Sequence, residues 1–271
     1  MITNNLSPQI FPCENPTDKP RRVYLCEDTP EGILSAIHMA WSSRYGHSHN
    51  FIQINTCQDN NMFYEYITVE SDINKAKSIA DAIKKKISYD FYELVELCLL
   101  SDDSSRADDI YRLIILGFSV GPSARTYLAY PAIQHVMKLE KNVWNEYHHY
   151  LGFLRFEELQ DKTLFARFRP HNNIVSKVIP HFADRFPEEN IMIVDVTRHI
   201  VAVSSKGRIA YAITDTDFDK ITLPTSANEQ LLQNLWRCFV DSVAINERSN
   251  PKLQQQLMPL RFREFATEFL K

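Results

Sequence analysis

Residues 146–198 read EYHHYLGFLRFEELQDKTLFARFRPHNNIVSKVIPHFADRFPEENIMIVDVTR. Four of the nine histidines of the chain lie in this stretch and a fifth follows it directly, and its arginines stand beside aromatic residues. The two nucleotide-binding patterns, GxGxxG and GxxxxGK[ST], are missing from the chain. No metal-cluster or nucleophile motif is present outside this stretch either. The functional hypotheses therefore rest on this stretch.

The first part of the stretch predicts an antiparallel β-hairpin. Two alternating runs, residues 151–158 (LGFLRFEE) and 163–169 (TLFARFR), flank the turn-like segment LQDK. Alternation places one set of side chains in the core and the other set on the opposite face. The core set comprises Leu154, Phe156, Leu164, Ala166 and Phe168. The opposite set comprises Phe153, Arg155, Phe165, Arg167 and Arg169.

Arginines interleaved with aromatic rings are the residues that phosphate binding combined with base stacking requires. Arg155, Arg167 and Arg169 would contact phosphates, and Phe153 and Phe165 would stack on bases. The alternative is that the arginines are solvated or pair with Glu157 and Glu158, while the phenylalanines pack under another helix.

Residues 172–186 predict an amphipathic helix with a kink or break at Pro180. Its second face carries Lys177, His181 and Asp184. His181 and Asp184 are spaced as an acid–base pair or as two metal ligands. A third ligand would have to come from His148, His171 or Asp195. Two ligands do not define a site, so the alternative is a packed His–Asp pair, and no metal is predicted.

Three short strands follow, at residues 191–196, 199–204 and 208–214. Asp195 lies in the apolar run IMIVDV and requires a partner, for which Arg198 and Arg185 are the candidates. Asp195 is either half of a structural ion pair or a functional carboxylate, and the sequence leaves both interpretations open. The whole unit predicts the order β-β-α-β-β-β, an antiparallel sheet with a helix on one face.

The flanking regions predict mainly helices. Before the central unit, helices are expected at residues 28–44, with Thr29 as the cap and Pro30 at the first helical position, and at 72–101, 107–120 and 131–150. Strands are expected at 23–27 and 63–69, and a loop at 46–61. After it, a helix over 229–246 is expected to bury Leu231, Leu232, Leu235, Trp236 and Phe239. The predicted class is α+β, with regions 1–150 and 151–271 that form either two domains or one integrated domain.

Composition limits the classes of function. The net charge is −4, and only residues 151–210 are positive, with nine basic and seven acidic side chains, so a nucleic-acid surface must be local. The five cysteines form no CxxC and no cradle for an iron–sulfur cluster. No apolar run reaches membrane-spanning length. These features predict a cytoplasmic protein without a cofactor.

Several blocks of the sequence resemble a bacterial protein family. The blocks are Glu146, His148 and Gly152–Phe156 (an E-x-H-x-x-x-G-F-L-R-F pattern), Pro170–Asn172, the HFADRF of His181–Phe186, and Ile193, Asp195 and Arg198. The closing motif around Met258–Pro259 and Arg261–Phe262 also resembles that family, although Arg263 stands where a second aromatic residue is usual. In the block at Pro170 the histidine directly follows the proline, which departs from the P-x-H pattern.

The resembled family consists of radical-SAM-linked proteins of DNA metabolism and DNA repair that contain a domain of unknown function. A related region is fused to uracil-DNA-glycosylase-like domains in some bacteria. The resemblance implies a process and not a reaction. It implies an accessory protein of DNA metabolism that binds DNA, a radical-SAM partner, or both.

Three functional hypotheses follow. In the first, the accessory protein binds DNA through Phe153, Phe165 and the cationic residues Arg155, Arg167, Arg169, Lys177, Arg185 and Arg198. In the second, a hydrolase or nuclease uses acid–base or metal-ligating groups drawn from Glu146, His148, His171, His181, Asp184 and Asp195. In the third, the protein is a non-catalytic scaffold.

Overall fold

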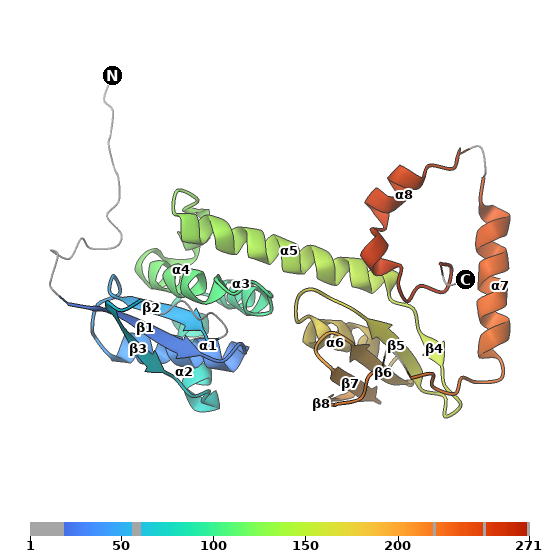
Figure 1. Cartoon of the computed structure of the whole chain (residues 1–271), viewed down its shortest axis with the longest axis horizontal. Helices are drawn as coiled ribbons and strands as arrows, with labels where there is room; N and C mark the ends of the chain where they lie inside the picture. The colour runs from blue at the N-terminus through green and yellow to red at the C-terminus, as the bar shows by residue number, and fades with distance from the viewer. Residues whose placement is uncertain (1–18, 56–60, 219–220, 246–247, 270–271) are drawn as a thin grey trace, which may run out of the picture. The chain divides into compact units, whose positions relative to one another are not determined.

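The computed structural model describes residues 19–55, 61–218, 221–245 and 248–269, and the chain divides into two compact units, residues 1–143 and 144–271 (Figure 1). About 49% of the described residues are helix and 18% are strand, with helices and mixed sheets in one chain, so the predicted α+β class is confirmed. The division into regions 1–150 and 151–271 stays a prediction.

The first unit combines a small parallel sheet with helices. Strands β1 (Arg21–Cys26), β2 (Asn50–Ile54) and β3 (Tyr64–Thr68) pair in the order β2-β1-β3. The helices are α1 (Pro30–Ser42), α2 (Ile73–Lys86), α3 (Tyr89–Leu99), α4 (Arg106–Val120), the 3₁₀ turn η1 (Gly121–Thr126) and the start of α5 (Pro131–Phe153).

Local chemistry explains where α1 begins. The Thr29 hydroxyl accepts a hydrogen bond from the Gly32 N–H at 3.0 Å, and Pro30 occupies the first helical position. The prediction of a loop at residues 46–61 is wrong for Asn50–Ile54, which form strand β2. Its alternating buried positions Asn50, Ile52 and Ile54 complete the sheet, although a polar residue at every second or third position disguises the strand.

The second unit contains a five-stranded sheet covered by one helix (Figure 1). Strands β4 (Glu157–Glu158), β5 (Leu164–Phe168), β6 (Asn190–Asp195), β7 (Ile200–Ser205) and β8 (Arg208–Ile213) pair in sequence order, and α6 (Val175–Arg185) lies between β5 and β6. The predicted order β-β-α-β-β-β is therefore confirmed. Lys206 and Gly207, with φ of 49° and 75°, form the β7–β8 turn.

One predicted pairing is wrong, because β5 and β6 are parallel rather than antiparallel. A helix that connects two neighbouring strands carries the chain back to the end of the sheet where the first strand began. The second strand therefore runs in the same direction as the first. The other pairs, β4–β5, β6–β7 and β7–β8, are antiparallel. Buried Val178, Ile179 and Phe182 of α6 face the sheet, and the helix stays continuous through Pro180.

The expected first strand of the hairpin is also wrong over most of its length. Helix α5 continues to Phe153, and β4 retains only Glu157 and Glu158. The reason is packing at helical spacing, because Phe153 stacks on His149, one turn earlier, with ring centroids 5.7 Å apart.

The C-terminal part of the second unit contains α7 (Glu229–Val243), α8 (Pro251–Leu257) and the 3₁₀ turn η3 (Leu260–Phe262). The expectation that α7 buries its apolar stripe is wrong. The stripe residues are between 41% and 58% exposed: Leu231, Leu232, Leu235, Trp236 and Phe239. Amphipathic periodicity identifies a helix, but it does not show that another surface covers the apolar face.

The described cysteines differ in reactivity. Burial raises the pKa of Cys26 to about 12 and also raises that of Cys98, whereas Cys238 is exposed. Because the thiolate is the nucleophile, native protein treated with iodoacetamide at neutral pH should be alkylated at Cys238 and not at Cys26 or Cys98. Peptide mass spectrometry with and without urea checks this result. Labelling of Cys98 in native protein as fast as that of Cys238 would contradict the described packing.

Candidate arginine-lined site

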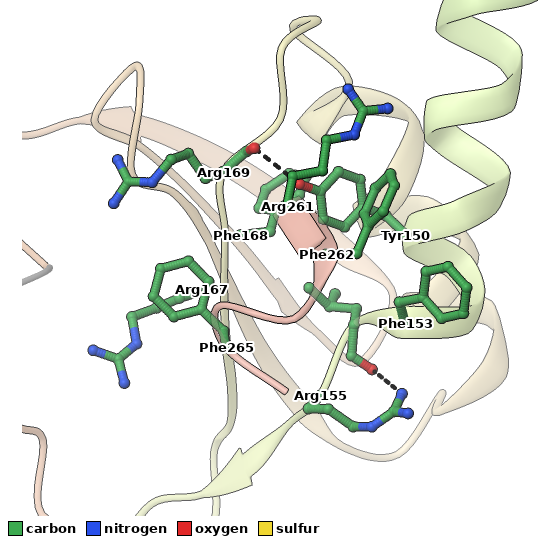
Figure 2. A pocket seen from close by; sticks show the side chains of 10 residues that line it. Tyr150, Phe153, Arg155, Arg167, Phe168, Arg169, Arg261, Phe262 and Phe265 are labelled. Atoms are coloured by element: carbon green, nitrogen blue, oxygen red, sulfur yellow. Dashed lines mark hydrogen bonds between the residues drawn. The ribbon is translucent and has the colours of Figure 1, made fainter. Parts of the chain in front are cut away.

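A narrow pocket in the second unit brings four arginines together with aromatic side chains (Figure 2). Its volume of about 10 Å³ is enough for about one water molecule. The lining residues are Tyr150, Phe153, Leu154, Arg155, Arg167, Phe168, Arg169, Arg261, Phe262 and Phe265. We call Arg155, Arg167, Arg169 and Arg261 the arginine face, and residues 260–269 the C-terminal segment.

Aromatic packing fixes the C-terminal segment at this pocket. Phe262 is 4% exposed, and its ring centroid lies 4.8 Å from that of Tyr150 and 5.6 Å from that of Phe153. Tyr150 in turn packs edge-on against Phe168 at 4.9 Å, and its hydroxyl donates to the Arg169 carbonyl at 2.9 Å. The end of α5, strand β5 and the C-terminal segment therefore share one aromatic cluster.

The Glu146 carboxylate is almost completely buried, with 1% exposure. It accepts hydrogen bonds from the backbone N–H groups of His171 and Asn172 at 3.0 and 2.8 Å, and from the Asn172 side-chain amide at 2.6 Å. Arg261 lies 3.6 Å from the same carboxylate. With both oxygens occupied in this way, Glu146 positions the loop after β5.

Asp195 holds the same loop through Arg198. The Asp195 carboxylate accepts from the backbone N–H groups of Thr197 and Arg198, and from the Arg198 guanidinium at 3.2 Å. Arg198 also donates to the carbonyls of Pro170 and His171. Burial raises the pKa of Asp195, while Arg198 and the hydrogen bonds oppose that rise. Arg198, not Arg185, is therefore the ion-pair partner of Asp195.

The contacts made by Glu146 and by the Asp195–Arg198 pair together form a clamp on residues 170–172. The clamp fixes the backbone directly after Arg169 and leaves the His171 side chain exposed. Because buried carboxylates bonded to backbone N–H groups resist displacement, this loop should be one of the rigid parts of the second unit.

The side chains of the arginine face mostly contact carboxylates of the chain. Arg155 donates to both Glu268 oxygens at 2.7 and 3.3 Å, and Arg169 forms a forked pair with Glu264 at 3.1–3.2 Å. Burial tends to raise the pKa of Glu268, but hydrogen bonds from Arg155 and Trp236 outweigh it and hold that pKa below its usual value. Arg155 and Arg169 therefore pair with the C-terminal segment, and not with Glu157 and Glu158, which were the alternative partners.

Arg167 differs from its neighbours because it contacts a backbone carbonyl and two aromatic rings. It donates to the Phe218 carbonyl at 3.2 Å and lies 5.7 and 5.4 Å from the ring centroids of Phe165 and Phe265. The prediction that Phe165 faces solvent is wrong, since it is 3% exposed and packs with Leu159, Val194 and Val196. Phe165 therefore has no exposed surface for stacking on a base.

The predicted histidine and carboxylate cluster does not assemble among the described residues. No group of three or more His, Cys, Asp or Glu side chains in that part of the chain could hold a metal ion. His148 contacts the Trp144 carbonyl at 3.0 Å, and His181 packs against Phe182. Asp184 is exposed. Of the predicted cations on α6, Lys177 is half-buried and Arg185 lies over the Phe186 ring at 5.6 Å.

Sequence reasoning missed the acidic partners of the site. Glu264 and Glu268 lie about a hundred residues after the arginines that they contact, and nothing local links the two sets. The signal that could have found them is their spacing of four residues, which can place both carboxylates on one side of a short segment. That segment begins with Arg261 and Phe262, which were predicted to dock.

Residues 104–268, more than half of the chain, match the family defined as a domain of unknown function, DUF4130. The chain belongs to this family. Comparison with curated proteins gives no match. No helix within the described ranges is both long enough and apolar enough to cross a membrane.

The clamp makes a prediction about stability. Glu146→Gln keeps the shape of the side chain but replaces one acceptor oxygen with an NH₂ group that faces N–H donors. The free energy of unfolding should fall by about 2 kcal/mol or more, since hydrogen bonds to a buried charged group are lost. Urea unfolding of the full chain measures the change. The control Glu188→Gln, at an exposed position, should change stability little, and an equal effect of both variants would refute the clamp.

Proposed function

We propose that the protein is an accessory protein of DNA metabolism that binds DNA through the arginine face. The observation that carries the proposal is the collection of four arginines around one aromatic-lined pocket, in a protein whose overall charge is negative. Arginine is the residue best suited to phosphate, because its planar guanidinium donates two parallel hydrogen bonds to phosphate oxygens. The rigid clamp next to Arg169 would reduce the entropy lost when such contacts form.

The carboxylate partners of the arginines do not prevent this role. The side chains of Arg169 and Glu264 are 40% and 42% exposed, and such a solvated pair stabilises a protein by about 1 kcal/mol or less. A phosphate could replace Glu264 at little energetic cost. The Arg155–Glu268 pair is less accessible, at 26% and 11% exposure. Arg167 and Arg169 are therefore the stronger candidates for the first phosphate contacts.

The proposed partner is a radical-SAM protein that acts on DNA. The basis for this partner is the resemblance of the Glu146, His181–Phe186 and Asp195 blocks to the radical-SAM-linked family. The sequence contains no CxxxCxxC, so any radical-SAM chemistry would belong to the partner. In this proposal the present chain contributes DNA binding and positioning.

DNA binding is tested with Arg167→Ala/Arg169→Ala. Fluorescence anisotropy against single- and double-stranded DNA at several salt concentrations should show salt-dependent binding by the unaltered protein. The double variant should bind at least about tenfold more weakly, with a log Kd–log salt slope reduced by about two, because two phosphate contacts are lost.

Two controls accompany this experiment. Arg208→Ala removes an exposed arginine of β8 outside the arginine face and should leave the slope nearly unchanged. Urea unfolding of each variant separates loss of binding from loss of fold. No binding of either DNA form at low salt, or equal weakening by Arg208→Ala and the double variant, would refute the arginine face as a DNA surface.

The glutamates of the C-terminal segment give a second prediction. If they compete with phosphate for Arg155 and Arg169, Glu264→Gln/Glu268→Gln should tighten DNA binding by about three- to tenfold, the value of one or two partly exposed ion pairs. The same anisotropy titration measures this change. Glu188→Gln/Glu189→Gln removes the same number of charges from another exposed place in the second unit. Equal tightening by both double variants would mean that net charge alone is responsible.

A further inference from the structure

A second, larger pocket lies in the first unit and shares no residue with the arginine-lined site. Its volume is about 410 Å³, within the range of about 300–1,000 Å³ that small-molecule sites occupy. It lies where the start of β2, the first half of α4 and the start of α5 meet. The residues that line it are Ser48, Phe51, Asp108, Asp109, Arg112, Tyr130, Pro131, Ala132 and Ile133.

One wall of this pocket is an internally neutralised ion pair. Arg112 donates to both oxygens of Asp108 at 3.2 Å and to the Asn50 carbonyl at 2.6 Å. Asp108 also accepts from the Ile52 N–H at 3.1 Å. The guanidinium lies 4.8 Å from the Phe51 ring centroid. Because Arg112 is committed to these contacts, it supplies a flat wall rather than a binding group for an anion.

Asp109 is the carboxylate that remains for a ligand. Its Oδ2 atom contacts His135 Nδ1 at 2.6 Å, and the other ring nitrogen of His135 lies 3.4 Å from Asp103. The described residues provide no hydrogen bond to Asp109 Oδ1. The Asp109 side chain is 22% exposed and lines the pocket. Burial raises the pKa of Asp109, and the hydrogen bond and charge of His135 oppose that rise.

The remaining lining is apolar and includes the rings of Phe51 and Tyr130 together with Pro131, Ala132 and Ile133. A carboxylate accepts hydrogen bonds and attracts positive charge, while aromatic and aliphatic walls favour a flat apolar body. An anionic ligand would be repelled by Asp109, and Arg112, the cation in the pocket lining, is already paired with Asp108.

We propose that this pocket binds a small organic cation that combines a flat apolar ring with N–H donors, as in an amidine or an aromatic amine, and that Asp109 is its counter-ion. Phe51 and Tyr130 contact the ring, and Asp109 accepts from the nitrogen. This site is independent of the arginine face, so the failure of either proposal leaves the other standing.

Benzamidine and benzoate are the probes, because they have similar shapes and opposite charges. Isothermal titration of the full chain should show saturable binding of benzamidine and at least about tenfold weaker binding of benzoate, the value of one charge-assisted hydrogen bond. Asp109→Asn should weaken benzamidine binding about tenfold. Asp81→Asn, at an exposed position of α2, should leave the affinity unchanged.

A second variant tests the pocket without altering the Asp109–His135 pair. Ala132→Trp places a large side chain in the pocket and should abolish benzamidine binding while the urea-unfolding midpoint stays close to that of the unaltered chain. The proposal is overturned if benzamidine does not bind, if benzoate binds equally well, or if folded Ala132→Trp binds benzamidine with unchanged affinity.

Discussion

The buried carboxylate of Glu146 is the constraint on which the second unit depends. It joins the last turns of α5 to the loop after β5 through two backbone N–H groups and one side-chain amide. A charge at 1% exposure is stable only when such partners surround it, so the helix end and the loop cannot separate without exposing or orphaning the carboxylate. Arg198, paired with Asp195, holds the same loop through the Pro170 carbonyl.

This constraint reaches the arginine face through the chain itself. Arg167 and Arg169 directly precede the clamped residues, and Arg261 brings the C-terminal segment to Glu146. Phe262 anchors that segment in the aromatic cluster, while Glu264 and Glu268 contact Arg169 and Arg155. The C-terminal segment therefore has two physical roles. Its apolar residues complete the core, and its acidic residues occupy the cations that the DNA-binding proposal assigns to phosphate.

The sequence predicted the parts of the fold that local periodicity controls. The helices of the first unit, α6 and the order of the five central strands follow from spacing and turn residues. The N-cap at Thr29 was also predictable, because capping involves residues three positions apart. The direction of β5 relative to β6 could have been inferred from the helix between them, because a helical connection joins parallel strands, but the sheet was predicted to be antiparallel throughout.

The parts that could not be predicted depend on distant contacts. Helix α5 overruns Gly152 because Phe153 packs on His149 and Phe262, and Phe262 is more than a hundred residues away. Phe165 turns inward because a core of Leu159 and Val194 is available to it. Two of the candidate residues, Glu146 and Asp195, accept hydrogen bonds from backbone N–H groups, and the sequence does not reveal these contacts. A sequence motif can identify such residues, but it does not show which groups they contact in the folded chain.

The most direct test of this account is native-state hydrogen exchange, measured by NMR, at the backbone amides of His171 and Asn172. Both N–H groups donate to buried Glu146, so their exchange should be slower by orders of magnitude than that of the Gly207 amide in the exposed β7–β8 turn. Exchange at His171 and Asn172 as fast as at Gly207 would show that the clamp does not hold in solution and would contradict the account.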